Sequence, residues 1–389
     1  ICSMQAKQRI LTGITTTGTP HLGNYLGAIK PSIAASQSDQ YDSFYFLADY
    51  HALIKCHDPR VIHRSTQELA AIWLALGLNI DKAAFYRQSD IVEIPQLCWL
   101  LTCMTSKGLM NRAHAYKAVV SDNLQQGNSD PDQGISMGLF SYPILMAADI
   151  LMFNAHYIPV GKDQIQHIEM CRDIAARFNH VYQPLFTLPQ AMLVEGEPSV
   201  LLGLDGRKMS KSYDNIIPLF APSDQLRKLI NQITTNSLGP GQPKKPDACT
   251  LFEIYQAFAT PAEVDEMRRR YAEGIAWGEV KRELFDYLDA YLSPARQRFE
   301  HIMQDPQYIE TKLQQGAVKA RQYSQPFMAQ LCAAVGIVPL GQVLVTSGDQ
   351  GVVKKTKVTI EKARALAGRQ KAIDIARQRE VNQTAQVQE

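Results

Sequence analysis

Two short segments that lie far apart in the sequence carry side chains suited to holding a polyphosphate. One of them, Asp205 to Ser212 (DGRKMSKS), places three cations within five positions, with hydroxyl groups between them. Lys208 and Lys211 are three residues apart, so both can reach one polyphosphate and stabilise the negative charge that builds on a leaving pyrophosphate. Considered alone, a run of this kind is more often a solvated loop.

The other segment is a turn rich in glycine and threonine, Ile14 to Pro20 (ITTTGTP), followed by His21 to Asn24 (HLGN). A turn between a strand and the start of a helix presents backbone N–H groups and the positive end of the helix dipole to an anion. It has neither the Gly-Lys-Ser/Thr of a Walker loop nor the glycine spacing of a dinucleotide turn. Gly23 would let a flat adenine or ribose approach the backbone, and His21 can donate to a phosphate. An ordinary glycine-containing turn fits the same residues.

A carboxylate interrupts the most apolar stretch of the chain. Tyr142, Met146, Asp149 and Ile150 lie at helical spacing on one face. Burying a carboxylate there without a partner costs several kcal/mol, so Asp149 needs a hydrogen-bond donor. The alternative is a helix kinked at Pro143, with Asp149 bonded to neighbouring backbone.

The segment that starts at Gly161 is a further candidate site. It follows an expected strand and opens an expected helix, so Gly161 can let a ribose approach the backbone while Gln164 and His167 project from the first turns. A satisfied core histidine is the alternative for His167.

These segments resemble the signatures of the class I aminoacyl-tRNA synthetases. His21 to Asn24 stands for the "HIGH" signature, and Lys208 to Ser212 stands for the "KMSKS" signature. Within that class the chain resembles the tryptophanyl-tRNA synthetases through three further segments. They are Phe46 to Leu53 (FLADYHAL), Tyr142 to Leu151 (YPILMAADIL) and Val160 to Glu169 (VGKDQIQHIE). The resemblance covers roughly residues 8 to 335.

The resemblance implies a two-step reaction. Tryptophan's carboxylate attacks the α-phosphorus of ATP to give tryptophanyl-adenylate and pyrophosphate, and a ribose hydroxyl of tRNA(Trp) then takes the acyl group. ATP is a substrate, and Mg²⁺ accompanies it without a dedicated protein metal site. The partners implied are tRNA(Trp), L-tryptophan, ATP and a second copy of the chain, in the cytoplasm and with no membrane. The rivals are a tyrosyl-tRNA synthetase and a non-catalytic paralogue that binds tRNA or protein.

The resemblance also assigns roles to residues. The implied catalytic set is His21, Lys117, Lys208 and Lys211. The implied ATP-binding set is Thr15, Thr16, Thr17, Gly23, Asn24, Gly161, Lys162, Asp163, Val200, Lys208, Met209, Ser210, Lys211 and Ser212. The implied tryptophan-binding set is Asp149, Tyr142, Met146, Ile150, Gln164, His51, Ile158 and Val160. Asp149 would accept the indole N–H, and ordinary core aromatics are the alternative for His51 and Tyr142.

Three features depart from the family pattern. Thr15 to Thr17 stand where relatives often carry Gln-Pro-Ser, so hydroxyls would meet the ATP. The polar run Ser121 to Gly134 exceeds the compact bacterial pattern and predicts a mobile loop. The tail beyond about residue 335 also exceeds it. Residues 351 to 389 hold nine lysines and arginines against four acidic residues, which fits either a tRNA contact or a solvated charged helix.

The elements that must position these residues alternate between short β-rich runs and longer helical ones, which predicts parallel strands joined by helices. The expected strands are Arg9–Gly13, Ser43–Ala48, Ala84–Gln88 and Tyr157–Val160. The expected helices are Gly23–Ile33, Val61–Leu76, Ile94–Cys103, Leu139–Phe153 and Asp163–Phe178. After residue 217 the pattern turns helical, apart from a short β-like piece at 342–346 and before a basic helix at 360–381.

The expected fold class is therefore α/β: a Rossmann-type, doubly wound parallel sheet followed by an all-helical domain. The expected domains are a catalytic domain at 4–217, a helical anticodon-binding domain at 218–335 and a basic extension at 336–389.

Composition agrees with a folded enzyme. The 389 residues are 46% hydrophobic and 20% charged, with a net charge of +2, which excludes a protein that coats nucleic acid by bulk charge. The seven cysteines are scattered without zinc or iron–sulfur spacing, so we expect reduced thiols. We expect neither a signal peptide nor a membrane span.

Overall fold

The computed structural model describes residues 7–161, 164–193, 201–247 and 249–341. The chain separates into two compact units, Ile1–Ala329 and Gln330–Glu389. The pieces expected at 342–346 and 360–381 lie outside the described residues. The domain limits given above stay a prediction.

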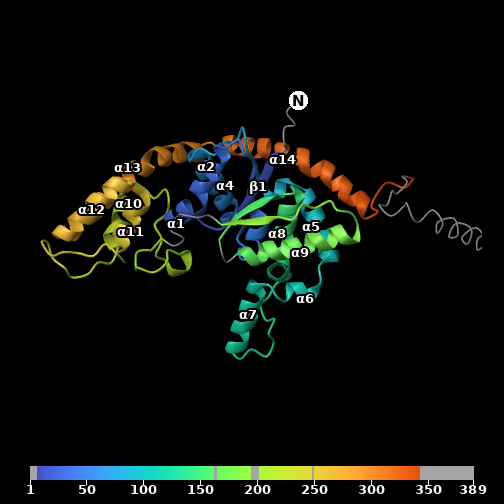
Figure 1. Cartoon of the computed structure of the whole chain (residues 1–389), viewed down its shortest axis with the longest axis horizontal. Helices are drawn as coiled ribbons and strands as arrows, with labels where there is room; N and C mark the ends of the chain where they lie inside the picture. Colours follow the sequence, from blue (N-terminus) through green and yellow to red (C-terminus); the bar gives the residue numbers. More distant parts are fainter. Residues whose placement is uncertain (1–6, 162–163, 194–200, 248, 342–389) are drawn as a thin grey trace, which may run out of the picture. The chain divides into compact units, whose positions relative to one another are not determined.

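A five-stranded parallel sheet forms the centre of the first unit (Figure 1). Its strands are β1 (Gln8–Thr15), β2 (Tyr41–Ala48), β3 (Ala84–Arg87), β4 (Tyr157–Val160) and β5 (Gln190–Leu193). They lie in the order β3-β2-β1-β4-β5, and every neighbouring pair is parallel. This is the doubly wound order, in which successive strands are added first on one side of β1 and then, from β4 onward, on its other side, and it confirms the expected fold class.

Four of the strands were expected, and β5 was not. Residues Phe44 to Ala48 of β2 are all buried, as expected for a central parallel strand covered on both faces. By contrast, β5 has only four residues, most of them exposed, and gives no run of buried residues to recognise. Gly13 of β1 has a packing reason, because a Cβ there would lie 2.5 Å from the Phe46 ring.

Helices follow the strands in the part of the chain before residue 217. Their bounds are α1 (Leu22–Asn24), α2 (Lys30–Gln37), α3 (Asp49–Ala52), α4 (Pro59–Ala75), α5 (Glu93–Met104), α6 (Lys107–Met110), α7 (His114–Gln125), α8 (Met137–Met152) and α9 (Ile165–Val181). A π-helical turn, η1 (Tyr25–Ile29), joins α1 to α2, so the single helix expected at 23–33 is a run of three segments. Short 3-10 turns are η2 (Gln88–Asp90) and η4 (Lys211–Tyr213).

The part after residue 217 is helical, as expected. It contains α10 (Ser223–Gln232), α11 (Thr250–Phe258), α12 (Pro261–Glu273), α13 (Trp277–Met303) and α14 (Pro306–Ala334). One hydrophobic core continues from α4 and η1 into these helices and includes Leu26, Trp73, Leu219, Phe252 and Leu284.

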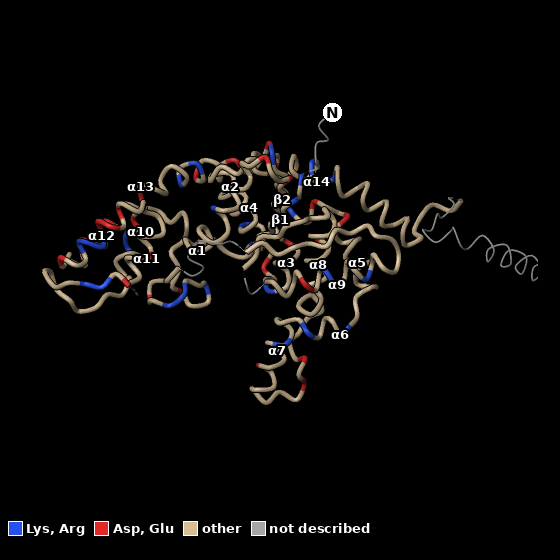
Figure 2. The backbone as a smooth tube through the Cα atoms, viewed as in Figure 1, with Lys and Arg blue, Asp and Glu red and all other residues tan. Residues whose placement is uncertain are grey.

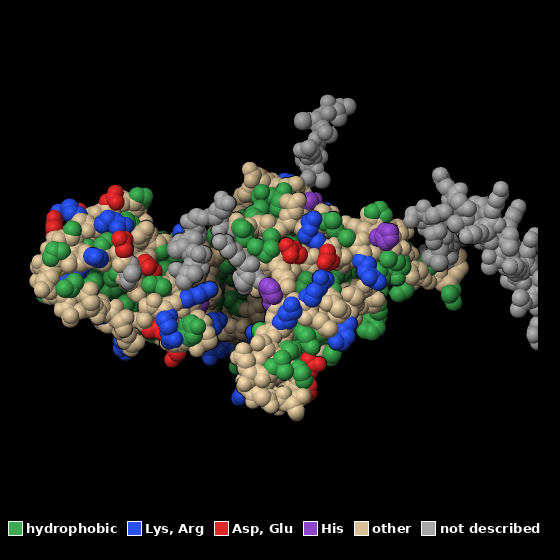
Figure 3. Space-filling view, turned by 60° about the horizontal axis from the view of Figure 1, so that its bottom comes forward, with side chains coloured by type: hydrophobic (Ala, Val, Ile, Leu, Met, Phe, Trp, Pro, Cys, Tyr) green, Lys and Arg blue, Asp and Glu red, His purple; other side chains and the backbone are tan. Residues whose placement is uncertain are grey.

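Residues of both charge signs lie along α12, where acidic residues precede the three consecutive arginines 268–270 (Figure 2). Arg269 pairs with Glu266 and Glu273 of the same helix, and Arg270 pairs with Glu279 and Glu283 of α13. Elsewhere one face of the molecule is hollowed, and Lys and Arg side chains lie on both sides of the hollow (Figure 3).

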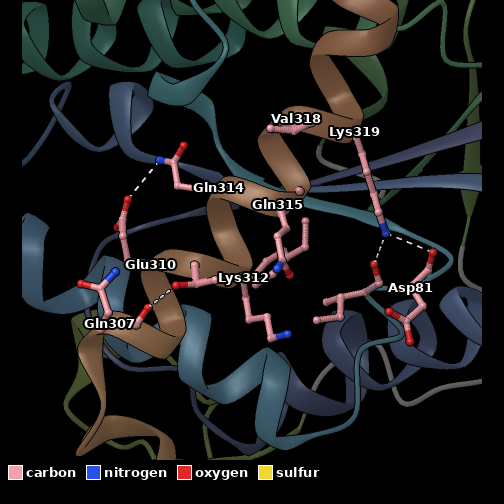
Figure 4. Close-up of a pocket in the computed structure, with 12 residues that line it drawn as sticks. Asp81, Gln307, Glu310, Lys312, Gln314, Gln315, Val318 and Lys319 are labelled. Carbon is pink, nitrogen blue, oxygen red and sulfur yellow. Dashed lines mark hydrogen bonds between the residues drawn. The ribbon is translucent and has the colours of Figure 1, made fainter.

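Helix α14 packs along the edge strand β3 (Figure 4). Gly316 lies so close that a Cβ would meet the Phe85 carbonyl, and Lys319 donates to the carbonyls of Ile80 and Asp81. Ion pairs also join α14 to the elements after β3, as between Arg321 and the buried Glu93. These contacts hold α14 along β3, from the residues that precede the strand to the helix α5 that follows it.

The polar run at 121–134 is not simply a loop. Its first residues continue α7 to Gln125, and the side chain of Asn123 donates to the carbonyls of Pro131 and Gln133. Tyr116 donates to Asp132 at 2.7 Å. The expectation of a wholly irregular segment was therefore wrong for residues 121–125.

Within the described residues, no helix is both long and apolar enough to cross a membrane.

Candidate active site

Two cavities open near the carboxyl ends of the strands, where ligands bind in sheets of this order. The first, here the Asp149 cavity, has a volume of about 570 Å³ and is lined by residues of β1, β2, α8 and β4. The expected tryptophan-binding residues His51, Tyr142, Met146, Asp149, Ile150, Ile158, Val160 and Gln164 all line it. The fold thus gathers the whole expected set around one space.

Asp149 is buried and is held by side chains from other elements. It is 1% exposed. Its Oδ2 lies 2.9 Å from His51 Nε2, and the amide of Gln88 donates to Oδ1 at 2.8 Å and to Oδ2 at 3.0 Å. These partners replace the neighbouring backbone that the kinked-helix alternative required. Desolvation raises the pKa of Asp149, and the hydrogen bonds from His51 and Gln88 oppose that rise.

The carboxylate keeps room for one more donor. Two carboxylate oxygens offer about four acceptor positions, and three hydrogen-bond contacts to Asp149 are made by His51 and Gln88. Apolar side chains such as Met146 and Ile150 line the same cavity. The arrangement suits a flat apolar group that carries one N–H or O–H.

A second chain of hydrogen bonds lies on the wall of the cavity. The Tyr142 hydroxyl lies 2.7 Å from His167 Nε2, and His167 Nδ1 lies 2.9 Å from Gln164 Oε1. Because an amide oxygen only accepts, Nδ1 carries the proton and Nε2 accepts from the tyrosine. His167 is buried and hydrogen-bonded, as the core-histidine alternative expected, yet it orients two residues of the cavity.

The second cavity, here the signature cavity, has a volume of about 610 Å³. Both signatures contribute to it, through His21, Gly23, Asn24, Lys208, Met209, Ser210, Lys211 and Ser212. Backbone bonds hold the two together: Leu22 N–H donates to the Ile217 carbonyl, and Leu219 N–H donates to the Pro20 carbonyl. Two segments almost half the chain apart therefore face one space.

His21 is a neutral donor in this setting. It is 8% exposed. Desolvation, followed by the charges of Lys211 and Lys208, lowers its pKa from 6.5 to about 4. Its Nδ1 accepts from Asn24 N–H at 3.3 Å, so the single proton of the neutral ring is on Nε2. His21 can donate that proton in a hydrogen bond without adding a third positive charge.

Lys211 links the two cavities. Its Nζ donates to the Thr17 carbonyl at 2.7 Å, and Thr17 lines the Asp149 cavity. Desolvation lowers the pKa of Lys211. The ammonium group therefore lies at the junction between the two spaces.

Several expected ATP residues lie at that junction or outside both linings. Thr15, Thr17 and Gly161 line the Asp149 cavity. Thr16 is buried, and its hydroxyl has no hydrogen-bond partner in the described part of the chain. Lys117 is exposed on α7 and lines neither cavity, so its catalytic role stays a prediction. Lys162, Asp163 and Val200 lie outside the described residues.

Sequence reasoning missed Gln88 and Asn215. Gln88 is fully buried and ends an expected strand, and the carboxyl end of a parallel strand is itself a signal for a site residue. Asn215 is buried three residues after the second signature, and its side chain bonds to that signature. Nothing in the residue type marks that role.

The family comparison agrees with this geometry. The family model for "tRNA synthetases class I (W and Y)" matches residues 3–293. A tryptophan–tRNA ligase of Neisseria meningitidis is 56% identical over 335 residues, which are 86% of this chain and 99% of that protein. The chain belongs to the class I tRNA synthetases, in the tryptophan–tRNA ligase group.

Further relatives support the same membership of the tryptophan–tRNA ligases. The tryptophan–tRNA ligase of Pseudomonas aeruginosa is 58% identical over 352 residues, which cover 90% of this chain and 78% of that protein. The crystal structure of Campylobacter jejuni tryptophanyl-tRNA synthetase, complexed with ADP and tryptophan, has a TM-score of 0.77 and 39% identity. It matches 85% of this chain and 100% of that chain.

A member of the sister family has the same fold. A tyrosyl-tRNA synthetase of Archaeoglobus fulgidus has a TM-score of 0.55 and 19% identity, which shows a shared fold alone. The expected family is confirmed, and the tyrosyl alternative is disfavoured.

Proposed function

We propose that this chain activates L-tryptophan with ATP and transfers the tryptophanyl group to the 3′ end of tRNA(Trp). The observation that carries the proposal is the buried Asp149 carboxylate, which retains one acceptor position in an apolar cavity. An indole offers one N–H on a flat apolar ring and matches that position. A buried polar group of this kind discriminates strongly, because a ligand without the donor leaves it unpaired.

The tryptophan carboxylate would then point towards the junction at Lys211. One carboxylate oxygen attacks the α-phosphorus of ATP, the bond between the α- and β-phosphates breaks, and pyrophosphate leaves with the bonding electrons. No side chain need remove a proton in this step, because the nucleophile is already an anion. Catalysis therefore consists of positioning and charge stabilisation.

His21, Lys208 and Lys211 supply that stabilisation in our proposal. All three line the signature cavity. The two lysines neutralise charge on the separating pyrophosphate, and His21 donates from Nε2. Mg²⁺ would enter with the ATP phosphates.

Transfer completes the reaction. The ribose 2′-hydroxyl of the terminal adenosine of tRNA(Trp) attacks the carbonyl carbon of the adenylate, and AMP leaves as the ester forms. We propose that the helical part, from residue 218 to about 335, contacts the anticodon and that the reaction takes place in the cytoplasm.

We also propose that the enzyme is a homodimer. Trp99 on α5 is 67% exposed, and Val92 and Cys103 lie on the same helical face. Burying a large aromatic side chain against a second copy would remove considerable apolar area from water. Light scattering should show a dimer that Trp99→Asp converts to a monomer.

The experiment that tests the function is amino-acid-dependent ATP–pyrophosphate exchange, measured separately with each of the twenty amino acids. Tryptophan alone should support rapid exchange. Exchange with tyrosine instead would favour the sister activity, and no exchange with any amino acid would favour a non-catalytic paralogue.

A further inference from the structure

The loop that carries the second signature is held in shape by one buried asparagine. Asn215 is 2% exposed and lies three residues after the end of the signature. Its Oδ1 accepts from Ser210 N–H at 2.8 Å, and its Nδ2 donates to the Lys208 carbonyl at 3.1 Å and to Asp205 Oδ1 at 2.7 Å. One amide side chain therefore contacts the loop at three points.

The backbone of Asn215 closes the same loop. Its carbonyl accepts from Leu204 N–H at 3.0 Å. Gly203 lies against it, where a Cβ would come within 2.4 Å of the Asn215 carbonyl oxygen. The chain reverses at Asp214, whose φ of 50° is left-handed. The loop thus folds back onto Asn215 from both of its arms.

Asn215 also stands next to the joint between the two signatures. Two residues further on, the Ile217 carbonyl accepts from Leu22 N–H, within the first signature. The side chains of Lys208 and Lys211 are exposed, whereas Met209 between them is buried in the hydrophobic core. The hydrogen bonds of Asn215 hold the backbone at Lys208 and Ser210, on either side of that buried residue.

We propose that Asn215 is a positioning residue that holds Lys208 and Lys211 opposite His21 during tryptophan activation, with Asp205 as its anchor. This inference rests on the proposed function. The hydrogen bond from Asn215, followed by the hydrogen bonds from Arg207, lowers the pKa of Asp205 to about 2. Asp205 is therefore an anion at neutral pH, and a charged acceptor strengthens the bond from the amide.

Exchanging the amide of Asn215 and the carboxylate of Asp205 tests whether the two side chains act as a pair. Asn215→Asp keeps the acceptor for Ser210 N–H but sets a second carboxylate against Asp205. We expect a loss of about 10- to 100-fold in kcat for pyrophosphate exchange, with the KM for tryptophan unchanged. The single variant Asp205→Asn keeps an amide oxygen that can accept from Asn215. Its kcat for pyrophosphate exchange should fall about threefold, because the variant loses the ion pair with Arg207.

The double variant D205N/N215D places the amide on the opposite side of the pair and should recover about tenfold over N215D. A normal kcat in N215D would overturn the proposal, and so would a double variant as slow as N215D. Equilibrium binding of tryptophan serves as the folding check, because the Asp149 cavity is built from other elements. Loss of tryptophan binding in N215D would make Asn215 a fold residue and also overturn the proposal. If the unaltered enzyme showed no tryptophan-dependent exchange, the proposed function itself would fail.

Discussion

The Asp149 cavity and the signature cavity lie side by side but are built in opposite ways. In the first, the polar groups are buried and bonded to one another, as with Asp149, His51 and Gln88. In the second, the cations are exposed and sit on a loop, as with Lys208 and Lys211. Buried hydrogen bonds reject a wrong ligand, whereas exposed charges attract any polyphosphate.

The difference assigns a separate task to each region. In our proposal, the cavity between the strands and α8 selects the amino acid, and the loop stabilises the leaving group. Variants of the Asp149 cavity should therefore change kcat/KM for tryptophan and leave the KM for ATP nearly constant. Variants of the signature cavity should change kcat for exchange and leave the KM for tryptophan nearly constant.

The largest expected effect is in the signature cavity. Lys211→Ala removes a cation that acts as pyrophosphate separates, so kcat for exchange should fall by about 100-fold or more, with the KM for tryptophan unchanged. Lys228→Ala, an exposed lysine on α10, is the control and should have no effect. A rise in the KM for ATP alone, with kcat intact, would make Lys211 a ground-state contact.

Variants of the Asp149 cavity should impair the use of tryptophan and leave the KM for ATP constant. Asp149→Asn turns one amide N–H against the donors of Gln88 and His51 and removes the charge that favours the indole. We expect kcat/KM for tryptophan to fall by about 10- to 100-fold, while the KM for ATP stays constant. Unchanged kcat/KM for tryptophan would remove Asp149 from the binding site.

The protonation of His21 in the signature cavity can be examined through the pH dependence of the free energy of unfolding. The pKa of His21 is lowered from 6.5 to about 4, so the folded state binds the proton more weakly than the unfolded state. The contribution of His21 to the free energy of unfolding is therefore fully present above about pH 6.5 and is lost as the pH falls towards 4. The loss should be about 2 kcal/mol after allowance for solvent contact.

Urea unfolding of the wild type and of His21→Gln should show this loss as a difference between the two proteins. The free energy of unfolding of the wild type should fall relative to the variant across that pH range. His114→Gln, at an exposed histidine, is the control. Parallel pH curves for wild type and His21→Gln would contradict the lowered pKa of His21, whether desolvation or the two lysines cause it.

The smallest expected effect sharpens the account of the rigid cavity. Gln88→Leu leaves Tyr50 N–H with its bond to Asp49 but takes one donor from Asp149. We expect a cost of about 1 to 1.5 kcal/mol in kcat/KM for tryptophan and none in the KM for ATP. Gln125→Leu at the exposed end of α7 is the control, and equal costs in the two variants would deny Gln88 a role.

Much of this could be read from the sequence, for definite reasons. β2 was recognisable because a central parallel strand is a continuous apolar run, and Tyr142, Met146 and Asp149 were grouped because helical spacing places them on one face. The two signatures were recognisable only as a pair, because together they resemble the signatures of one enzyme class.

Other features depend on contacts that no local pattern encodes. Gln88 acts through a carboxylate 61 residues away in the chain, and Asn215 acts through a loop geometry that forms only on folding. β5 is too short and too exposed to show a period. The placement of Lys117 outside both cavities also follows from the course of α7 and could not be foreseen.

The central claim is that the buried cavity holds the indole while the signature cavity holds the phosphates. A crystal structure with a non-hydrolysable analogue of tryptophanyl-adenylate tests it most directly. We predict the indole N–H within hydrogen-bonding distance of the Asp149 carboxylate, and the phosphate beside Lys211 at the junction of the cavities. An indole bound away from Asp149, or a phosphate inside the Asp149 cavity, would contradict the account.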